Sequence, residues 1–194
     1  ITSGAQVANS ITIHGGSIKI NGGSLTGGDI VNDGTITVGA GGTLSMISNQ
    51  ITGTGTVIIN GTLETSKATG LSGTASTTVS NTISSLLLGS ASTIDYTSAG
   101  AQTITANNYA NINNSGNGDR ILSNTGVIGI SSVFSPGSGN YTVTGSTVEF
   151  NGSAPQTIPA LAPSSEYNNL EINNTAGVSM VADLNLIDAL TLTD

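Results

Sequence analysis

Apolar and polar residues alternate in short runs along this chain, at the period of two that is typical of β-strands. Every second residue is apolar in residues 17–20 (Ser-Ile-Lys-Ile) and 146–150 (Ser-Thr-Val-Glu-Phe), and the alternation returns at 35–38, 92–96 and 169–172. This pattern predicts strands with one face turned to a core and the other to solvent. No window of eleven or more residues keeps apolar residues at i, i+3, i+4 and i+7, so we expect no long helix.

Residues 10–66 repeat with a period of roughly twenty residues. Triplets of the type Ser/Thr-Ile/Val-x begin at residues 17, 35 and 56, and Ser/Thr-Leu pairs begin at residues 24, 43 and 62, which gives spacings of 18, 21, 19 and 19. A third short run, at 29–31 and again at 49–51, fits between them. Three short strands per coil predict a parallel β-solenoid, with about nine or ten coils stacked at ~4.8 Å into a rod of ~45 Å.

A longer repeat covers the second half of the chain. Residues 92–104 (STIDYTSAGAQTI) match residues 146–158 (STVEFNGSAPQTI) at an offset of 54. The match resumes between residues 109–112 and 167–170 at an offset of 58, so the second copy has four additional residues. A unit that cannot bury its own apolar face is stabilised by its neighbour, so we treat residues 1–194 as one repetitive segment of a longer chain. The two copies cover about residues 92–145 and 146–194.

Glycine marks the corners of the predicted coils. We expect positive φ angles at five corner glycines, namely Gly22, Gly34, Gly42, Gly61 and Gly152. Asn-Gly pairs could instead close hairpins, so tandem antiparallel β-sandwich repeats are the alternative fold. The persistent period near twenty favours the solenoid. The apolar run Leu86-Leu87-Leu88 predicts a strand buried on both faces, with a short helical turn as the alternative.

Composition narrows the classes of function. Three fixed cations stand against eleven carboxylates, so nucleic acid is not an expected partner, because its affinity comes mostly from Lys and Arg. The chain has no cysteine, which removes disulfides and thiolate metal sites. No run approaches 18 apolar residues, so we expect no membrane span in this segment.

Several stretches carry a resemblance to a known class of repeats. They are residues 53–57 (GTGTV), 62–73 (TLETSKATGLSG), 134–141 (FSPGSGNY) and the strand pattern of 146–174. Together they resemble the strand-repeat regions of large surface and secreted adhesin-type proteins of Bacteroidota. The resemblance implies an extracellular or cell-surface stalk or filament segment. Its implied partners are further repeats of the same chain or other copies of itself end to end, with surface glycans as a further possibility.

Residues of the kind that catalysis requires are scarce. His14 is the only histidine, and no acid or nucleophile stands in a recognised relation to it, so we expect an exposed structural residue. No Gly-x-Ser-x-Gly nucleophile elbow follows a strand. Residues 116–121 (GNGDRI) come close to the calcium-binding nonapeptide of secreted β-rolls, but Asp119 follows Gly118 without the spacer residue. We therefore predict no catalytic residues and no organic cofactor.

Acidic residues offer a candidate metal site. Glu149, Glu166 and Asp183 are evenly spaced along the chain, and Glu171 and Asp188 are separated by the same interval. If the last coils are as long as that interval, these carboxylates stack ~5 Å apart, where a cation or a raised pKa must relieve their repulsion. Calcium is the candidate ligand. Solvated residues on the outer face are the competing interpretation.

Three functions remain open from the sequence. The favoured one is a non-catalytic rod that spaces or displays something else. The first alternative is a carbohydrate-binding or carbohydrate-active parallel β-helix, but four of the six aromatics lie at repeat positions that predict burial, namely Tyr96, Tyr109, Phe150 and Tyr167. The second alternative is an ice-binding solenoid, although Thr-x-Thr rows at 35–37, 142–144 and 191–193 do not fall on successive coils.

Overall fold

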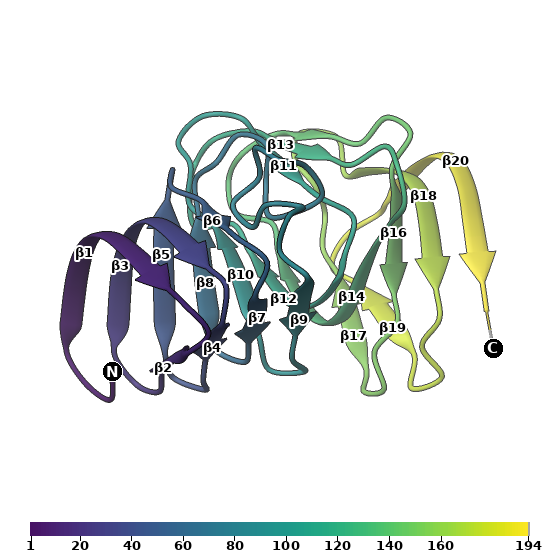
Figure 1. Cartoon of the computed structure of the whole chain (residues 1–194). Coiled ribbons are helices and arrows are strands. Elements are labelled where there is room, and N and C mark those ends of the chain that lie inside the picture. The colour runs from purple at the N-terminus through teal and green to yellow at the C-terminus, as the bar shows by residue number, and fades with distance from the viewer. Residues whose placement is uncertain (194) are drawn as a thin grey trace.

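The computed structural model describes residues 1–193 as an all-β solenoid, with no helix in that range. The winding runs from the N-terminus to the C-terminus along one axis, with about nine turns roughly 20 residues apart (Figure 1). Every pairing between named strands is parallel, as between β1 and β3 or between β18 and β20. The predicted parallel solenoid is therefore confirmed, and the antiparallel β-sandwich alternative is wrong.

Four sheets make up the wall of the rod. The largest contains β1 (Ala5–Ile13), β3 (Ser24–Asn32), β5 (Thr43–Ile47), β8 (Thr62–Thr65), β10 (Thr93–Tyr96), β12 (Asn108–Asn113), β14 (Val127–Ser135), β16 (Thr147–Phe150), β18 (Glu166–Ile172) and β20 (Asn185–Leu192), in that order, with β6 (Ile51–Thr52) beside β3. The second contains β2 (Ser17–Ile20), β4 (Thr35–Val38), β7 (Thr56–Ile59) and β9 (Ser85–Leu88). The third contains β11 (Gln102–Ile104), β13 (Arg120–Leu122) and β15 (Tyr141–Thr142), and the fourth contains β17 (Gln156–Ile158) and β19 (Val178–Met180).

Long strands bend and contribute to two faces of the wall. The start of β3 pairs with β5 while its end pairs with β6, so one strand serves two of the three runs expected in each coil. Strand β14 does the same: residues 127–130 pair with β16, whereas residues 133–135 pair with β12 only. Three runs per turn are thus present, although two of them are often fused into one strand.

The two long repeats occupy different faces of the rod. Strand β10 pairs with the second half of β12, but its counterpart β16 pairs with the first half of β14. The first repeat runs from β10 to β15 and contains eight strand segments when β12 and β14 are each counted as two halves. Three such segments make one turn. One repeat therefore winds about two and two-thirds turns. This explains why β11 and β13 lie at the top of Figure 1 while β17 and β19 lie at the bottom.

Columns of like residues fill the core, as the alternation predicts. Val148 and Phe150 are fully buried, whereas Thr147 and Glu149 on the same strand are partly exposed. Ile94 and Val148 each stack on an aliphatic residue of the next turn, Ile112 and Leu170 respectively. Stacking of this kind buries aliphatic side chains from turn to turn, so the core needs few aromatics.

The corner glycines serve a purpose different from the one predicted. Of the five, only Gly22 has a positive φ, 153°. At Gly42 a Cβ atom would lie 2.1 Å from the carbonyl oxygen of Ile20, and at Gly61 it would lie 2.3 Å from that of Gly39. These glycines are required because the backbone of the preceding turn approaches closely, so the expectation of positive φ is wrong at four of the five corners.

Leu86-Leu87-Leu88 forms strand β9, but it is not buried on both faces. Leu87 is 52% exposed, and Leu86 and Leu88 are only partly buried. Leu87 pairs with Ile58 of β7, which lies in the outward column of that sheet. The strand β9 therefore presents the apolar side chain of Leu87 to solvent. Before it, the chain makes an excursion and returns to the winding at Val79, which bridges Ile51 in parallel. Thr62 of β8 therefore pairs with Thr93 of β10 across a long coil.

Candidate functional sites

Gln102 and Gln156, the glutamines of the two long repeats, make equivalent contacts. The Gln156 side chain donates from Nε2 to the carbonyl oxygens of Ile130 (2.8 Å) and Ser132 (3.0 Å), and its Oε1 accepts from Gly152 N (2.7 Å). Gln102 donates to Thr65 O (3.0 Å) and Lys67 O (3.1 Å) and accepts from Ser98 N (2.9 Å). Each buried amide thus ties one turn to carbonyl groups of an earlier turn.

The tyrosines at repeat positions are buried, as predicted. Tyr109 donates its hydroxyl to Thr105 O (2.8 Å), and Tyr167 donates to Pro159 O (2.8 Å), which is the equivalent acceptor in the second copy. Tyr96 donates to the Tyr109 hydroxyl (2.9 Å), because the proton of Tyr109 is already used. Burial raises the pKa of each of these three hydroxyls above its ordinary value. Phe150 replaces Tyr96 in the second copy and is also fully buried.

The corner at residues 116–121, which resembles a calcium-binding loop, is filled by the side chain of Arg120. Arg120 is fully buried, and its guanidinium donates to Gly118 O (2.6 Å), Tyr96 O (2.8 Å) and Asn114 Oδ1 (3.0 Å). Further acceptors are the carbonyl oxygens of three residues, namely Ser98, Gly116 and Asp119. All of these acceptors are neutral, and burial lowers the pKa of Arg120. The carbonyl cluster that a metal ion would need is therefore occupied by a guanidinium group.

The structure does not bring the three predicted calcium ligands into one column. Glu149 lies opposite Glu171, and Glu166 lies opposite Asn185. Asp183 is exposed in the turn before β20. The predicted column required a coil as long as the interval from Glu149 to Glu166. Both strand pairings join residues that are farther apart in sequence than that interval, so Glu149, Glu166 and Asp183 do not share a column.

Glu149 and Glu171 are instead the carboxylates brought to neighbouring positions. Glu149 accepts from Asn151 Nδ2 (3.0 Å) at one oxygen and from Asn173 Nδ2 (3.0 Å) at the other. Two amide donors partly compensate the charge of Glu149 without a cation. Among residues 1–193 no group of three or more His, Cys, Asp or Glu side chains is placed to hold a metal ion.

His14 is exposed in the turn between β1 and β2, with no recognised acid–nucleophile partner in the sequence. The hydroxyls expected of an ice-binding surface form single columns. Ser17, Thr35, Thr56 and Ser85 follow one another on the second sheet, but the adjacent column is Lys19, Thr37, Ile58 and Leu87. The described part of the chain also contains no helix with the length and apolar character that a membrane span requires.

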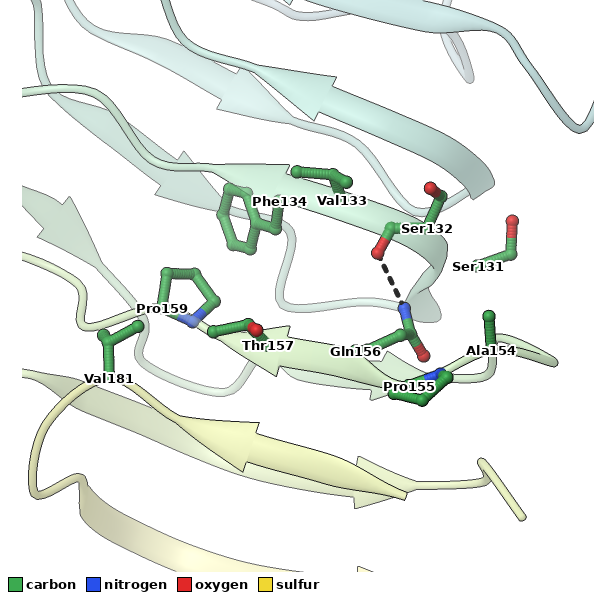
Figure 2. Close-up of a pocket in the computed structure, with 10 residues that line it drawn as sticks. All are labelled: Ser131, Ser132, Val133, Phe134, Ala154, Pro155, Gln156, Thr157, Pro159 and Val181. Carbon is green, nitrogen blue, oxygen red and sulfur yellow. Dashed lines mark hydrogen bonds between the residues drawn. The ribbon is translucent and has the colours of Figure 1, made fainter. Parts of the chain in front are cut away.

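A groove between β14 and β17 was not foreseen from the sequence. Figure 2 shows it, with Gln156 donating across it to Ser132 O. Its volume is about 360 Å³, and its lining includes Ser131, Ser132, Thr157 and the exposed Val133. None of its ten lining residues is ionisable, so this groove offers hydrogen bonds and van der Waals contact but no acid or base.

The first repeat explains why the groove could not be predicted. There, Thr103 N donates to Ala68 O (2.9 Å) and joins β11 to the preceding turn. In the second repeat β17 pairs only with β19, and the groove lies on its other side. The sequence difference that accompanies it is the four-residue insertion after β17, and no motif in that insertion indicates a hollow.

A second hollow lies at the C-terminal end of the rod. Its volume is about 340 Å³, and aliphatic or methionine side chains make up nine of its ten lining residues, among them Met180, Leu186 and Leu190. It is the exposed end of the core, left open beside β19 and β20. Together these features define a β-solenoid repeat protein. Comparison of the chain with protein-family models, with curated proteins and with solved structures finds no match.

Proposed function

We propose that this chain is a non-catalytic structural segment, a stalk or filament part of an extracellular bacterial protein of the adhesin type. One observation carries the proposal: the glutamine and tyrosine side chains that recur between the two long repeats are buried and make their hydrogen bonds inside the rod. Gln102 and Gln156 bind carbonyls of earlier turns, and Tyr109 and Tyr167 bind carbonyls within their own repeat. Recurring side chains that are spent on building the rod itself support a role in setting length.

The surface is consistent with that role. The outward strand positions are mostly Thr, Ser, Asn and acids, and the net charge is −8, which favours solubility of an extended body. The groove between β14 and β17 lacks ionisable groups, which supports a function without acid–base chemistry. In this proposal the partners are further repeats of the same kind or other copies of the chain end to end. An extracellular or cell-surface location follows from the resemblance to surface adhesin repeats of Bacteroidota.

The test is to lengthen the rod by one repeat. A second copy of residues 92–145 inserted after Gly145 should add about two and two-thirds turns, or ~13 Å at ~4.8 Å per turn, to the maximum dimension in small-angle scattering. The circular dichroism spectrum should remain that of a β protein. As a control, the same insertion carrying Asp at the position of Ile94 should not stack, because a charge would enter the core column.

Two outcomes would contradict the proposal. An inserted repeat that folds but leaves the maximum dimension unchanged would remove the length-setting role. Saturable binding of a defined glycan by the original chain, lost on substitution of Ser132 or Thr157 in the groove, would replace spacing with recognition. Labelling of intact cells by an antibody against the chain tests the extracellular location, and a signal only after lysis would contradict it.

A further inference from the structure

Strand β20 is the counterpart of β14, one repeat later. Strand β12 pairs with β14 through Tyr109 and Ile130, and skips to Asn111 and Val133 at a bulge. Strand β18 pairs with β20 through Tyr167 and Leu186, and skips to Asn169 and Ala189 at the same bulge. The two strands can therefore be compared residue by residue. Ile128 corresponds to Leu184, Ile130 to Leu186, and Phe134 to Leu190.

The comparison shows that β20 lacks a cover that β14 has. Ile130 and Phe134 are 0% and 4% exposed, whereas Leu186 and Leu190 are 38% and 53% exposed. On β14 the cover consists of β16, with Val148 opposite Ile128 and Phe150 opposite Ile130, followed by the Gln156 amide on the carbonyls of Ile130 and Ser132. The equivalent carbonyl groups on β20 are those of Leu186 and Asp188.

The neighbouring strand β19 shows the same difference. It corresponds to β13, because Ile104 pairs with Leu122 and Ile158 pairs with Met180. Leu122 is 2% exposed in the structure, while Met180 is 62% exposed. Strand β15 lies on β13, and Val143, which follows β15, is buried. The hollow at the C-terminal end is thus the place that a β15-like strand would fill.

We infer that the surface formed by β19 and β20 is a docking surface for one further unit of the type found at residues 139–158. This unit supplies a β15-like strand over β19, a strand of the pattern hydroxyl, apolar, acid, aromatic over the start of β20, and a glutamine that binds the carbonyls of Leu186 and Asp188. The interface continues the one that β15, β16 and β17 already make one repeat earlier. The inference rests on the proposed role as a segment of a longer rod, and it specifies the partner of that rod's C-terminal face.

The N-terminal edge of a second molecule is a poorer match to this surface. Strand β1 places Gln6 opposite Leu25 and Ala8 opposite Gly27, so its inward column begins with a polar and a small residue. It offers no apolar and aromatic pair like Val148 and Phe150, and its glutamine lies inside the strand instead of following it as Gln156 follows β16. A unit of the 139–158 type is therefore the occupant that the geometry favours.

The experiment appends a copy of residues 139–158 after Asp194. The added equivalent of Thr147 then follows Thr191 at the same spacing at which Thr147 itself follows Ser135. Met180 should then react with hydrogen peroxide at least about tenfold more slowly, because an exposed thioether becomes enclosed. Met46, which is 0% exposed, is the internal reference for protection in both chains. Amide hydrogens of β20 should exchange more slowly by a similar factor.

Matched extensions keep the test specific. An extension with Asp at the position of Val148 should lose the protection, whereas one with Asp at the position of Thr147 should keep it. The inference is overturned if the unaltered extension leaves Met180 and β20 unprotected, or if the Val148→Asp extension protects equally. It is also overturned if the original chain self-associates and protects Met180 without any extension. The scattering experiment on the inserted repeat tests the rod itself, so a failure of docking is separable from a failure of the proposed function.

Discussion

Raising the pH from 8 to 11 should remove much of the stability of this solenoid, because of its four tyrosines. Burial raises the pKa of Tyr96, Tyr109, Tyr141 and Tyr167 above the value near 10 expected in the unfolded chain. A group whose pKa is raised on folding contributes its full stability below the unfolded pKa. That contribution is lost as the pH rises from about 10 towards the folded pKa, because only the unfolded chain releases its protons.

The magnitude follows from the number of hydroxyls. At pH 11 each tyrosine that stays protonated when folded lowers the free energy of unfolding by about 1.4 kcal/mol relative to pH 8. Four such groups together give about 5 kcal/mol, and Tyr141 belongs among them because its burial outweighs the opposing charge of Arg120. A domain of this size has a stability of about 5–15 kcal/mol, so the loss is a large fraction of the total.

The assay combines denaturant unfolding, followed by circular dichroism at pH 8, 10 and 11, with tyrosinate absorbance near 295 nm. Absorbance should appear together with unfolding and not as an independent titration near pH 10. Tyr96→Phe, which introduces the residue already present at Phe150, should reduce the loss between pH 8 and 11 by about 1.4 kcal/mol. Reversible ionisation of all four tyrosines near pH 10 in a chain that keeps its β spectrum and its stability would refute the reasoning.

Four further predictions concern the wall and the core. Val148→Asp should lower the stability by more than about 4 kcal/mol because an unpaired charge enters a stacked apolar column, while Thr147→Asp should change it by about 0.5 kcal/mol or less, and equal melting temperatures would contradict the assignment of faces. Ser146→Ala should lower the stability by about 1 kcal/mol, because the Ser146 hydroxyl donates to Val143 O, whereas Ser92→Ala should be neutral or stabilising, because the buried Ser92 hydroxyl has no partner among residues 1–193. A larger loss of melting temperature for Ser92→Ala than for Ser146→Ala would contradict these hydrogen-bond assignments. Gln156→Ala should cost about 2–4 kcal/mol, since it leaves Gly152 N and two carbonyl groups without their side-chain partner, and an unchanged melting temperature would mean that this amide does not join the turns. Millimolar calcium should not shift the melting temperature and chelation should not lower it, because Glu149, Glu166 and Asp183 do not share a column; a clear increase would restore the metal site.

The alternation of residues was sufficient to predict the winding and the inward columns. Val148 and Phe150 could be assigned to the core from sequence because a period of two leaves only one consistent choice of buried face. The roughly twenty-residue period could be read because strands in register must repeat at the length of the coil. The exposure of Leu87 was not predictable, since a run of three apolar residues does not show which of its faces is turned to solvent.

The polar contacts were less accessible from the sequence. The position of Gln156 in the repeat was visible, but its contacts with Ile130 and Ser132 depend on how β17 lies against the second half of β14. The predicted column of acids is absent because the even spacing of those acids was taken as the length of a coil, while the strands around Glu149 pair at longer offsets. The burial of Arg120 depends on carbonyl groups from two successive corners, which no single stretch of sequence contains.

One long repeat winds about two and two-thirds turns, which is a third of a turn less than three. The second copy is therefore related to the first by a rotation of about 120° around the rod axis, in addition to a translation along it. Equivalent side chains of the two copies therefore have different azimuths. The four-residue insertion of the second copy emerges in a different direction from the matching corner of the first, and a mutation at equivalent positions alters two different sides of the rod. In a tandem array built on this screw operation, three units would restore the original azimuth, so variable corners would follow a spiral and no side of the rod would be left without them.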